Sequence, residues 1–325
     1  MGLKIKISLI LLGFSFFLSF GQVEVKGASE NDSIVRKIYF PNKITLRAYF
    51  ISTSNTFNFS DKNQGIDFTL IPNKQNQLGF SAAFRSIIIS YSFAPKFLAE
   101  NRDNQNSELQ NLNLRTFLGQ WMVNFQLYKE KGFFIDVPEL DINEYFPNFK
   151  TRKTGGTLSY ILNKDFSFRA IVSQDEKQLV SAGSFIPNFF FYYTDYELKS
   201  EGINEDIYSY DMALAPAYYY NFVPSKNILL SAGGSAGLGL NITKSGDESL
   251  SSLLTELNFR ASVVYDKNNL YLGAHYSYLI LNHNFDRSTY VQDDIPYLQI
   301  FIGYRFKAPR FMVKTGDDVN KKLGL

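Results

Sequence analysis

The sequence predicts an all-β protein: a transmembrane antiparallel up-and-down β-barrel of about 12 strands (14 is the alternative), behind a cleaved signal peptide. The chain begins with an export leader and has no later apolar run long enough for a membrane-spanning helix. Its strands alternate apolar and polar residues over about ten positions. Aromatic residues make up 16% of the chain, yet mean hydropathy is only −0.15, as expected when lipid-facing and lumen-facing residues alternate.

The leader is the segment 1–21. Lys4 and Lys6 precede an apolar run at 7–20, and the triplet SFG before Gln22 is a small-x-small cleavage site. A membrane anchor is the weaker interpretation, because spanning a bilayer takes roughly 20 apolar residues. An exported chain without a spanning helix either stays soluble or closes into a barrel, so we expect a barrel in the Gram-negative cell envelope.

Composition excludes several classes of function. There is no cysteine, which removes disulfides, thiolate catalysis, cysteine metal sites and a lipoprotein anchor. Formal net charge is +2, and Lys4 and Lys6 of the leader account for it. The remaining chain is neutral, so it has no basic excess suited to nucleic acid.

The clearest strands lie near the C-terminal end, at 253–265, 270–280 and 297–306. In the first of these, one face is apolar and carries Leu257, Phe259, Ala261, Val263 and Tyr265. The opposite face carries Glu256, Asn258, Arg260 and Ser262. Soluble sandwiches seldom keep this pattern for ten residues, so a membrane wall is the better interpretation.

Further strands are expected at 227–241, 209–222, 166–175, 155–163, 132–137, 114–128, 86–94 and 76–84, with 43–52, 54–60 and 65–72 as candidates to complete an even number. Tight turns are expected on the periplasmic side, at 129–132, 163–165, 223–227 and 266–269. Long loops are expected on the other side, at 95–112, 138–153, 185–207, 242–252 and 282–295. The barrel would then occupy 43–308, between polar periplasmic tails at 22–42 and 309–325.

A polar cluster follows the predicted strand 166–175 directly. Together with inward-facing positions elsewhere it forms an expected polar group in the lumen: Arg169, Gln174, Asp175, Glu176, Gln178, Ser181, Ser184, Glu256, Arg260, His275 and Arg305. Arg47 and Asp67 would also point inward. Buried charges must be paired, so an ion-paired plug in a narrow barrel is the favoured interpretation. A polar passage or a binding pocket for a small solute stays open as the alternative.

We expect no catalytic residues, no metal and no cofactor. The only histidines are His275 and His283, without the spacing of a zinc motif, and no G-x-S-x-G is present. Ser181 or Ser184 could approach His275, so the rival function is a barrel hydrolase acting on lipid or peptide. Asp175 and Glu176 are adjacent and would point opposite ways on an extended chain, which makes them a poor acid/base pair.

Three segments carry a resemblance to a known family: FSFRAIVSQDEKQLVSAGSF at 166–185, LIPNKQNQLGFSAA at 70–83 and GYRFKAP at 303–309. The chain resembles family 4421 among the domains of unknown function, which are outer-membrane-barrel-like proteins. The resemblance implies a secreted barrel without an assigned activity, and it names no catalytic residues.

We therefore expect a non-enzymatic protein of the cell outer membrane, structural or serving small-solute passage or binding through a polar lumen. Its expected partners are outer-membrane lipid, the barrel-assembly machinery during insertion, and a small polar solute. Nucleic acid is not among them.

Overall fold

The computed structural model describes residues 35–61, 65–73, 76–99, 107–172, 175–200, 203–284 and 289–323. The predicted signal peptide lies outside the described residues, as does Gln174. Arg36–Leu325 form one compact unit.

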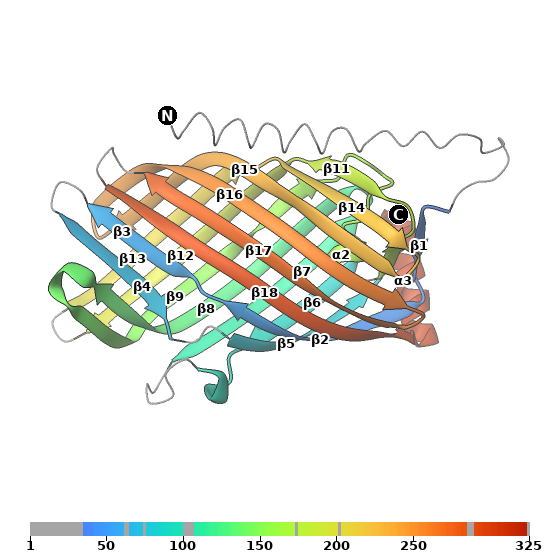
Figure 1. Cartoon of the computed structure of the whole chain (residues 1–325), viewed down its shortest axis with the longest axis horizontal. Coiled ribbons are helices and arrows are strands. Elements are labelled where there is room, and N and C mark those ends of the chain that lie inside the picture. The colour runs from blue at the N-terminus through green and yellow to red at the C-terminus, as the bar shows by residue number, and fades with distance from the viewer. Residues whose placement is uncertain are drawn as a thin grey trace. The chain divides into compact units, whose positions relative to one another are not determined.

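The wall of the unit is a single antiparallel meander that closes into a ring of twelve runs (Figure 1). Some runs comprise two strands that continue one another. In chain order the runs are β2 (Lys43–Thr53) with β3 (Thr56–Asp61); β4 (Ile66–Pro72) with β5 (Asn76–Phe84); β6 (Ile87–Phe93); β7 (Glu108–Leu118); β8 (Trp121–Val137); β9 (Ile142–Tyr160); β11 (Ala182–Ile186) with β12 (Asn188–Ser200); β13 (Ile203–Leu214) with β14 (Ala217–Ser225); β15 (Ile228–Ser245); β16 (Glu248–Lys267); β17 (Leu270–Asn284); and β18 (Thr289–Lys307).

Closure comes from the pairing of the last strand with the first. β18 runs antiparallel to β2, from Tyr297 opposite Thr53 to Lys307 opposite Lys43. A closed ring leaves no unpaired edge, so every backbone group of the wall can be satisfied within the protein. The predicted fold class, an up-and-down barrel of 12 strands, is confirmed.

The ring is narrower at the end away from the C-terminus. Beyond the ends of the short strands β6 and β7, β4 pairs directly with β8, from Thr69 opposite Asp136 to Pro72 opposite Phe133. On its other side β3 continues the pairing of the first run with β18. Strands β6 and β7 therefore end before they reach the rim of the barrel at this end.

The outer surface of the wall is apolar. On β16, Leu257, Phe259 and Val263 are exposed, with 51% of Phe259 accessible. On β18, Leu298, Ile300 and Ile302 are exposed in the same way. These are the faces that the alternation predicted, and they form a lipid-facing exterior. A closed barrel with this exterior is an outer-membrane β-barrel.

Several predicted boundaries are wrong although the strand number is right. Residues 166–175 do not form a wall strand. The predicted turn 129–132 lies inside β8, where Gly132 has a φ of 89° at a register shift, so it is a bulge and not a hairpin. The predicted loop 138–153 falls largely in β9, and 185–207 falls largely in β12.

The predicted loops 242–252 and 282–295 are also mostly paired strand, in β15 to β18. In the loop around 95–112, the described part contains the short 3₁₀ helix η1 (Lys96–Leu98) and the start of β7. A second 3₁₀ turn, η2 (Pro138–Leu140), joins β8 to β9. These strand ends carry polar residues on both faces, so alternation does not reveal them.

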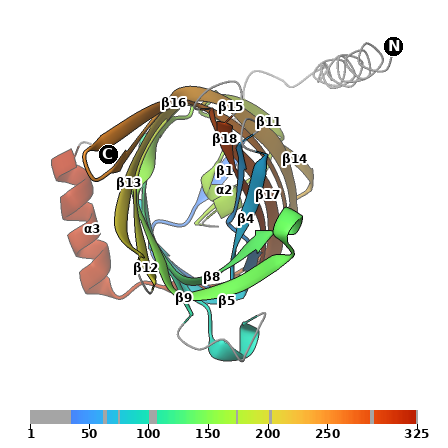
Figure 2. The ribbon, with the colours of Figure 1, turned by 90° about the vertical axis from the view of Figure 1, so that its left-hand side faces the viewer.

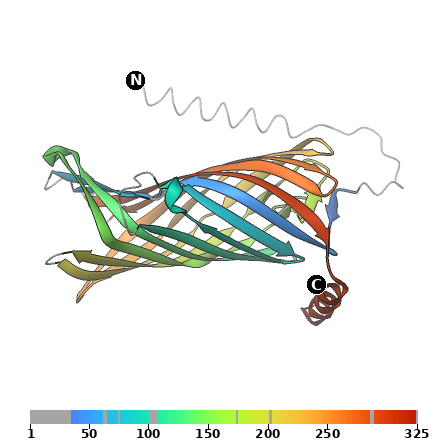
Figure 3. The same ribbon diagram turned by 90° about the horizontal axis from the view of Figure 1, so that it is seen from below.

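The segment after β18, predicted as a polar tail, forms helix α3 (Arg310–Leu323) beside the barrel end (Figure 3). Arg85, in the turn between β5 and β6, donates from Nη2 to the carbonyl of Val313 at 3.1 Å and pairs with Asp317. The predicted turns 223–227 and 266–269 lie at this end, which we call the periplasmic end after the sequence prediction. No helix among the described residues has the length and apolarity needed to cross a membrane.

Candidate functional site

The chain between β9 and β11 folds into the lumen instead of making a hairpin. It contains helix α2 (Arg169–Val172) and strand β10 (Glu176–Gln178). β10 pairs antiparallel with β1 (Lys37–Tyr39), which comes from the predicted N-terminal tail. Figure 2 looks into the barrel from the loop end and shows α2 and β1 inside the ring. We call the described residues of 161–181 together with 36–40 the plug.

The plug is packed into the wall by an apolar core. Phe166, Phe168 and Ile171 are buried, and the ring of Phe168 meets that of Tyr219 edge-on at 5.6 Å. The wall supplies inward-facing apolar side chains to the same cluster, including Tyr49, Ile51, Ala83, Ile88, Phe117, Met122, Leu229, Val264, Tyr271 and Phe301. The periplasmic half of the lumen is therefore filled as the core of a soluble protein is filled.

Ion pairs hold the polar side of the plug. Arg169 binds Asp175 and the backbone carbonyl of Arg85, and its Nε lies 3.8 Å from Glu176 Oε2. Lys37 Nζ of β1 lies 3.1 Å from Glu176 Oε1. Only 1% of Asp175 is exposed. The ion pairing expected of a plug is present here at Arg169, which is the arrangement a buried charge requires.

Burial and these charges shift three pKa values in the plug. Burial alone would lower the pKa of Arg169, but the charge and hydrogen bond of Asp175, together with nearby Tyr39 and Glu176, raise that pKa, so Arg169 stays a cation. Partial burial raises the pKa of Tyr39, against the opposing charge of Arg169. Partial burial lowers the pKa of Lys177, and the carboxylate of Asp266 offsets part of that effect.

The remaining polar residues of this segment fasten the plug to the wall. Gln178 Oε1 accepts from the backbone N of Ser167 at 2.8 Å and from Asn221 Nδ2 at 2.7 Å. Ser181 Oγ accepts from the backbone N of Val223 at 2.9 Å. Ser184, on β11, accepts from the backbone N of Asn163 at 3.0 Å. All of these hydrogen bonds lie within or beside the plug.

Arg305 lies at the periplasmic end and not in an open lumen. Its guanidinium makes a two-pronged contact with Asp266, at 2.9 Å from Nη1 to Oδ1 and 2.6 Å from Nη2 to Oδ2. It also lies 4.4 Å from the ring centroid of Phe40. Only 1% of Arg305 is exposed. Its role is structural, since both charges are buried and satisfied by one another.

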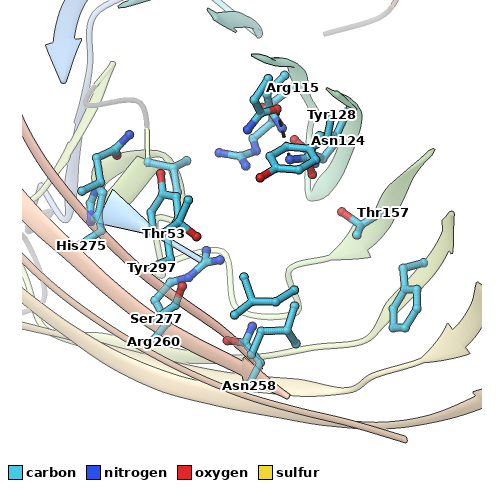
Figure 4. Close-up of a pocket in the computed structure, with 18 of the residues that line it drawn as sticks. Thr53, Arg115, Asn124, Tyr128, Thr157, Asn258, Arg260, His275, Ser277 and Tyr297 are labelled. Carbon is cyan, nitrogen blue, oxygen red and sulfur yellow. Dashed lines mark hydrogen bonds between the residues drawn. The ribbon is translucent and has the colours of Figure 1, made fainter. Parts of the chain in front are cut away.

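A cavity of about 440 Å³ lies on the loop side of the plug (Figure 4). Of the predicted polar group, Glu256, Arg260 and His275 line it. Arg47 lines it too, and donates from Nη1 to the carbonyl of Val172 in the plug at 2.8 Å. The predicted group is thus divided between the plug and the cavity above it. Asp67, expected to point inward, is exposed on β4.

The serines and the histidine of the predicted hydrolase do not meet. His275 Nδ1 lies 2.9 Å from Ser262 Oγ, and the imidazole stacks on Phe301 at 4.8 Å between centroids. Ser181 and Ser184 are engaged in the backbone contacts given above. His283 lies apart, with Nε2 3.4 Å from Asp211 Oδ1. Within the described part of the chain, no group of three or more histidine or acidic side chains is placed to hold a metal ion.

Sequence reasoning did not single out several residues that line the cavity, among them Arg115, Asn124 and Lys153. A signal for Arg115 was present in the run Asn111-Leu112-Asn113-Leu114-Arg115, which alternates polar and apolar residues along β7. The polar members of that run line the cavity. Lys153 gave no comparable signal because it falls in a segment predicted to be a loop.

Solved structures similar to this chain are outer-membrane barrels. One is an outer membrane channel from Pseudomonas putida F1 (10% identity, 85% of this chain, 100% of that one, TM-score 0.41). A second is the β domain of the Bordetella autotransporter BrkA (10% identity, 82% and 99%, TM-score 0.40). A third is the outer membrane protease OmpT of Escherichia coli (8% identity, 83% and 98%, TM-score 0.37).

None of the curated proteins matches the chain. A family model does match it, over residues 37–306, which include β1 of the plug and nearly the whole wall. The chain therefore belongs to the family described as Domain of unknown function (DUF4421).

Proposed function

We propose that this outer-membrane barrel binds a small polar solute in the cavity above the plug, reached from the loop end. The observation that carries the proposal is the position of a cavity of about 440 Å³, lined by charged and polar as well as apolar side chains, directly on an ion-paired plug. Small-molecule sites commonly enclose about 300–1,000 Å³. Passage of a solute to the periplasm is then a second step that needs the plug to move.

The contacts of the plug support a closed resting state. Its apolar side chains are packed against the wall, and Arg169, Asp175 and Gln178 are tied to neighbours on several sides. A tightly packed core without gaps does not conduct ions. The structural role predicted for the plug and the binding role of the cavity are therefore compatible.

Planar-bilayer recording tests this proposal. The wild-type protein should show little conductance, whereas Arg169→Met combined with Asp175→Asn, which removes the buried ion pair, should open more often. The exposed pair between Arg36 and Asp165, 3.5 Å apart, offers the control Arg36→Gln, which should leave the recording unchanged. A steady wild-type conductance equal to that of the double variant would contradict a plugged lumen.

Two partners follow from the same proposal. Outer-membrane lipid is the partner that fits the apolar outer face of the wall. We propose the barrel-assembly machinery as the partner during insertion. A hydrolase is not proposed, because Ser181 and Ser184 make their hydrogen bonds away from His275.

A further inference from the structure

We infer that the solute is an anion: the cavity is suited to a small polyhydroxylated molecule that carries a phosphate or a carboxylate group. This inference rests on the proposed function and specifies the class of ligand. Its basis is the set of charged and polar side chains that line the cavity opposite one another.

The lining has an excess of positive charge. It contains four cationic side chains, Arg47, Arg115, Lys153 and Arg260, and two carboxylates, Glu256 and Asp211. Both carboxylates already accept hydrogen bonds. Glu256 Oε1 accepts from Ser235 Oγ at 2.7 Å, and Asp211 Oδ1 accepts from Asn241 Nδ2 at 2.6 Å. A confined cavity lined by one dominant sign of charge concentrates solutes of the opposite sign.

Arg115 and Arg260 differ from Arg169 and Arg305 in their contacts with acidic side chains. Arg169 and Arg305 each contact a carboxylate, at Asp175 and Asp266. No described carboxylate lies within 4 Å of Arg115 or Arg260. Arg260 lies 6.0 Å from the ring centroid of Phe168, a plug residue.

Arg115 also experiences the positive charges of both Arg260 and Arg47. Like charges held in a partly desolvated site repel one another, and a bound anion would relieve that repulsion. The arrangement therefore favours occupancy by a negative group.

Four buried polar atoms of the cavity lining point to the same ligand. Arg115 Nε, Asn124 Oδ1, Asn258 Oδ1 and His275 Nε2 have no hydrogen-bond partner among the described residues. Figure 4 shows Arg115 and Asn124 on one side of the cavity, and Asn258, Arg260 and His275 on the other. Buried polar atoms are normally satisfied, so the side chains that carry these four atoms are the ones expected to turn toward a polar ligand in the cavity.

The chemistry of these groups defines the ligand class. A guanidinium is a planar fork that matches the two oxygens of a carboxylate or phosphate. Amides and hydroxyls, here Asn124, Asn258 and Ser277, suit the hydroxyl groups of a sugar-like molecule. Arg47 contributes charge but is committed to the plug through Val172.

Calorimetric titration of the purified full-length protein in detergent tests the inference, with glucose 6-phosphate, glucuronate and glucose as probes. Glucose 6-phosphate or glucuronate should bind at least about tenfold more tightly than glucose, the scale of a charge-assisted hydrogen bond. The anion that binds more tightly identifies phosphate or carboxylate as the preferred group. Raising the salt concentration should weaken binding of the anion and leave binding of glucose unchanged.

Matched variants locate the site. Arg115→Gln and Arg260→Gln should each lower the affinity for the anion about tenfold or more. Arg115→Lys keeps the charge and should lower that affinity less. Arg152→Gln is the control, because Arg152 is exposed on β9 and does not line the cavity. Heat-modifiable mobility on a gel verifies that each variant is folded.

The outcomes separate the two proposals. Equal binding of glucose and the anions, unchanged in Arg115→Gln, would overturn the anion inference and leave solute binding in place. Absence of binding for all three probes would overturn both. Anion binding that Arg152→Gln weakens as much as Arg115→Gln would also overturn the inference, because the site would then lie outside the cavity.

Discussion

The two halves of the lumen are built from the same hairpins and have opposite character. In the hairpin β7–β8, Phe117 lies opposite Met122, and both belong to the apolar core around the plug. The next inward pair, Arg115 opposite Asn124, lines the cavity. The change from core to cavity thus occurs within one step of the two-residue repeat. One barrel wall can therefore be packed like a soluble domain at one end and hydrated at the other.

The largest effect should come from the packed half. Asp175→Asn leaves the buried guanidinium of Arg169 without its nearest carboxylate and should cost about 3–5 kcal/mol in the free energy of unfolding. Urea unfolding of the protein in detergent micelles measures the change. Asp165→Asn is the matched control, because Asp165 pairs with Arg36 at an exposed site and should lose at most about 1 kcal/mol. Equal costs would mean that the plug is solvated.

Substitutions on the wall beside the cavity test which face meets lipid. Phe259→Arg places a charge on the exposed outer face and should cost about 2–4 kcal/mol, as measured by unfolding from lipid vesicles. Asn258→Arg, on the neighbouring cavity-facing position, should cost less. The reverse order would show that the strand faces are exchanged.

Adding a methyl group at Gly303 tests how tightly the periplasmic end of the lumen is packed. A Cβ at Gly303 would lie 2.2 Å from Tyr271 Oη and 2.4 Å from the carbonyl of Leu46. Gly303→Ala should therefore destabilise the barrel by about 1–3 kcal/mol in the same unfolding assay. Tyr271 Cζ lies 2.2 Å from the same Cβ, so adding Tyr271→Phe, which keeps that atom, should not recover the loss. If Gly303→Ala alone were as stable as the wild-type protein, this end of the lumen would contain unfilled space.

The smallest effect is expected in the cavity. Ser277 lines the cavity, and Ser277→Ala should change the free energy of unfolding by less than about 0.5 kcal/mol. Ser181→Ala, which removes the acceptor of the Val223 backbone N, should cost about 1 kcal/mol. Thermal denaturation of the two variants side by side provides the measurement, and a greater loss at Ser277 would place that residue in packed structure.

The sequence predicted the wall better than it predicted what fills the wall. Where one face meets lipid, as at Phe259, alternation identifies the face directly. At Phe166 to Val172 the same alternation was misleading. Phe168, Ala170 and Ile171 are buried because the segment is enclosed by the barrel, and Ile171 breaks the two-residue pattern. Periodicity alone does not separate a wall strand from a short enclosed helix.

The division of the polar residues between plug and cavity could not be predicted for a related reason. Arg305 and Arg260 both occupy inward positions on alternating strands. One is paired with Asp266 at the packed end, and the other faces the cavity. Their difference depends on depth along the barrel axis, which follows from strand register and tilt and from the position of the plug.

Arg85 connects the plug to the C-terminal helix. Its carbonyl accepts a hydrogen bond from Arg169 in the plug, while its side chain holds Val313 and Asp317 of α3. Arg85 acquires this full set of contacts only when both the plug and α3 are in place. One residue in a turn between two wall strands thus connects a segment inside the barrel to a helix outside it.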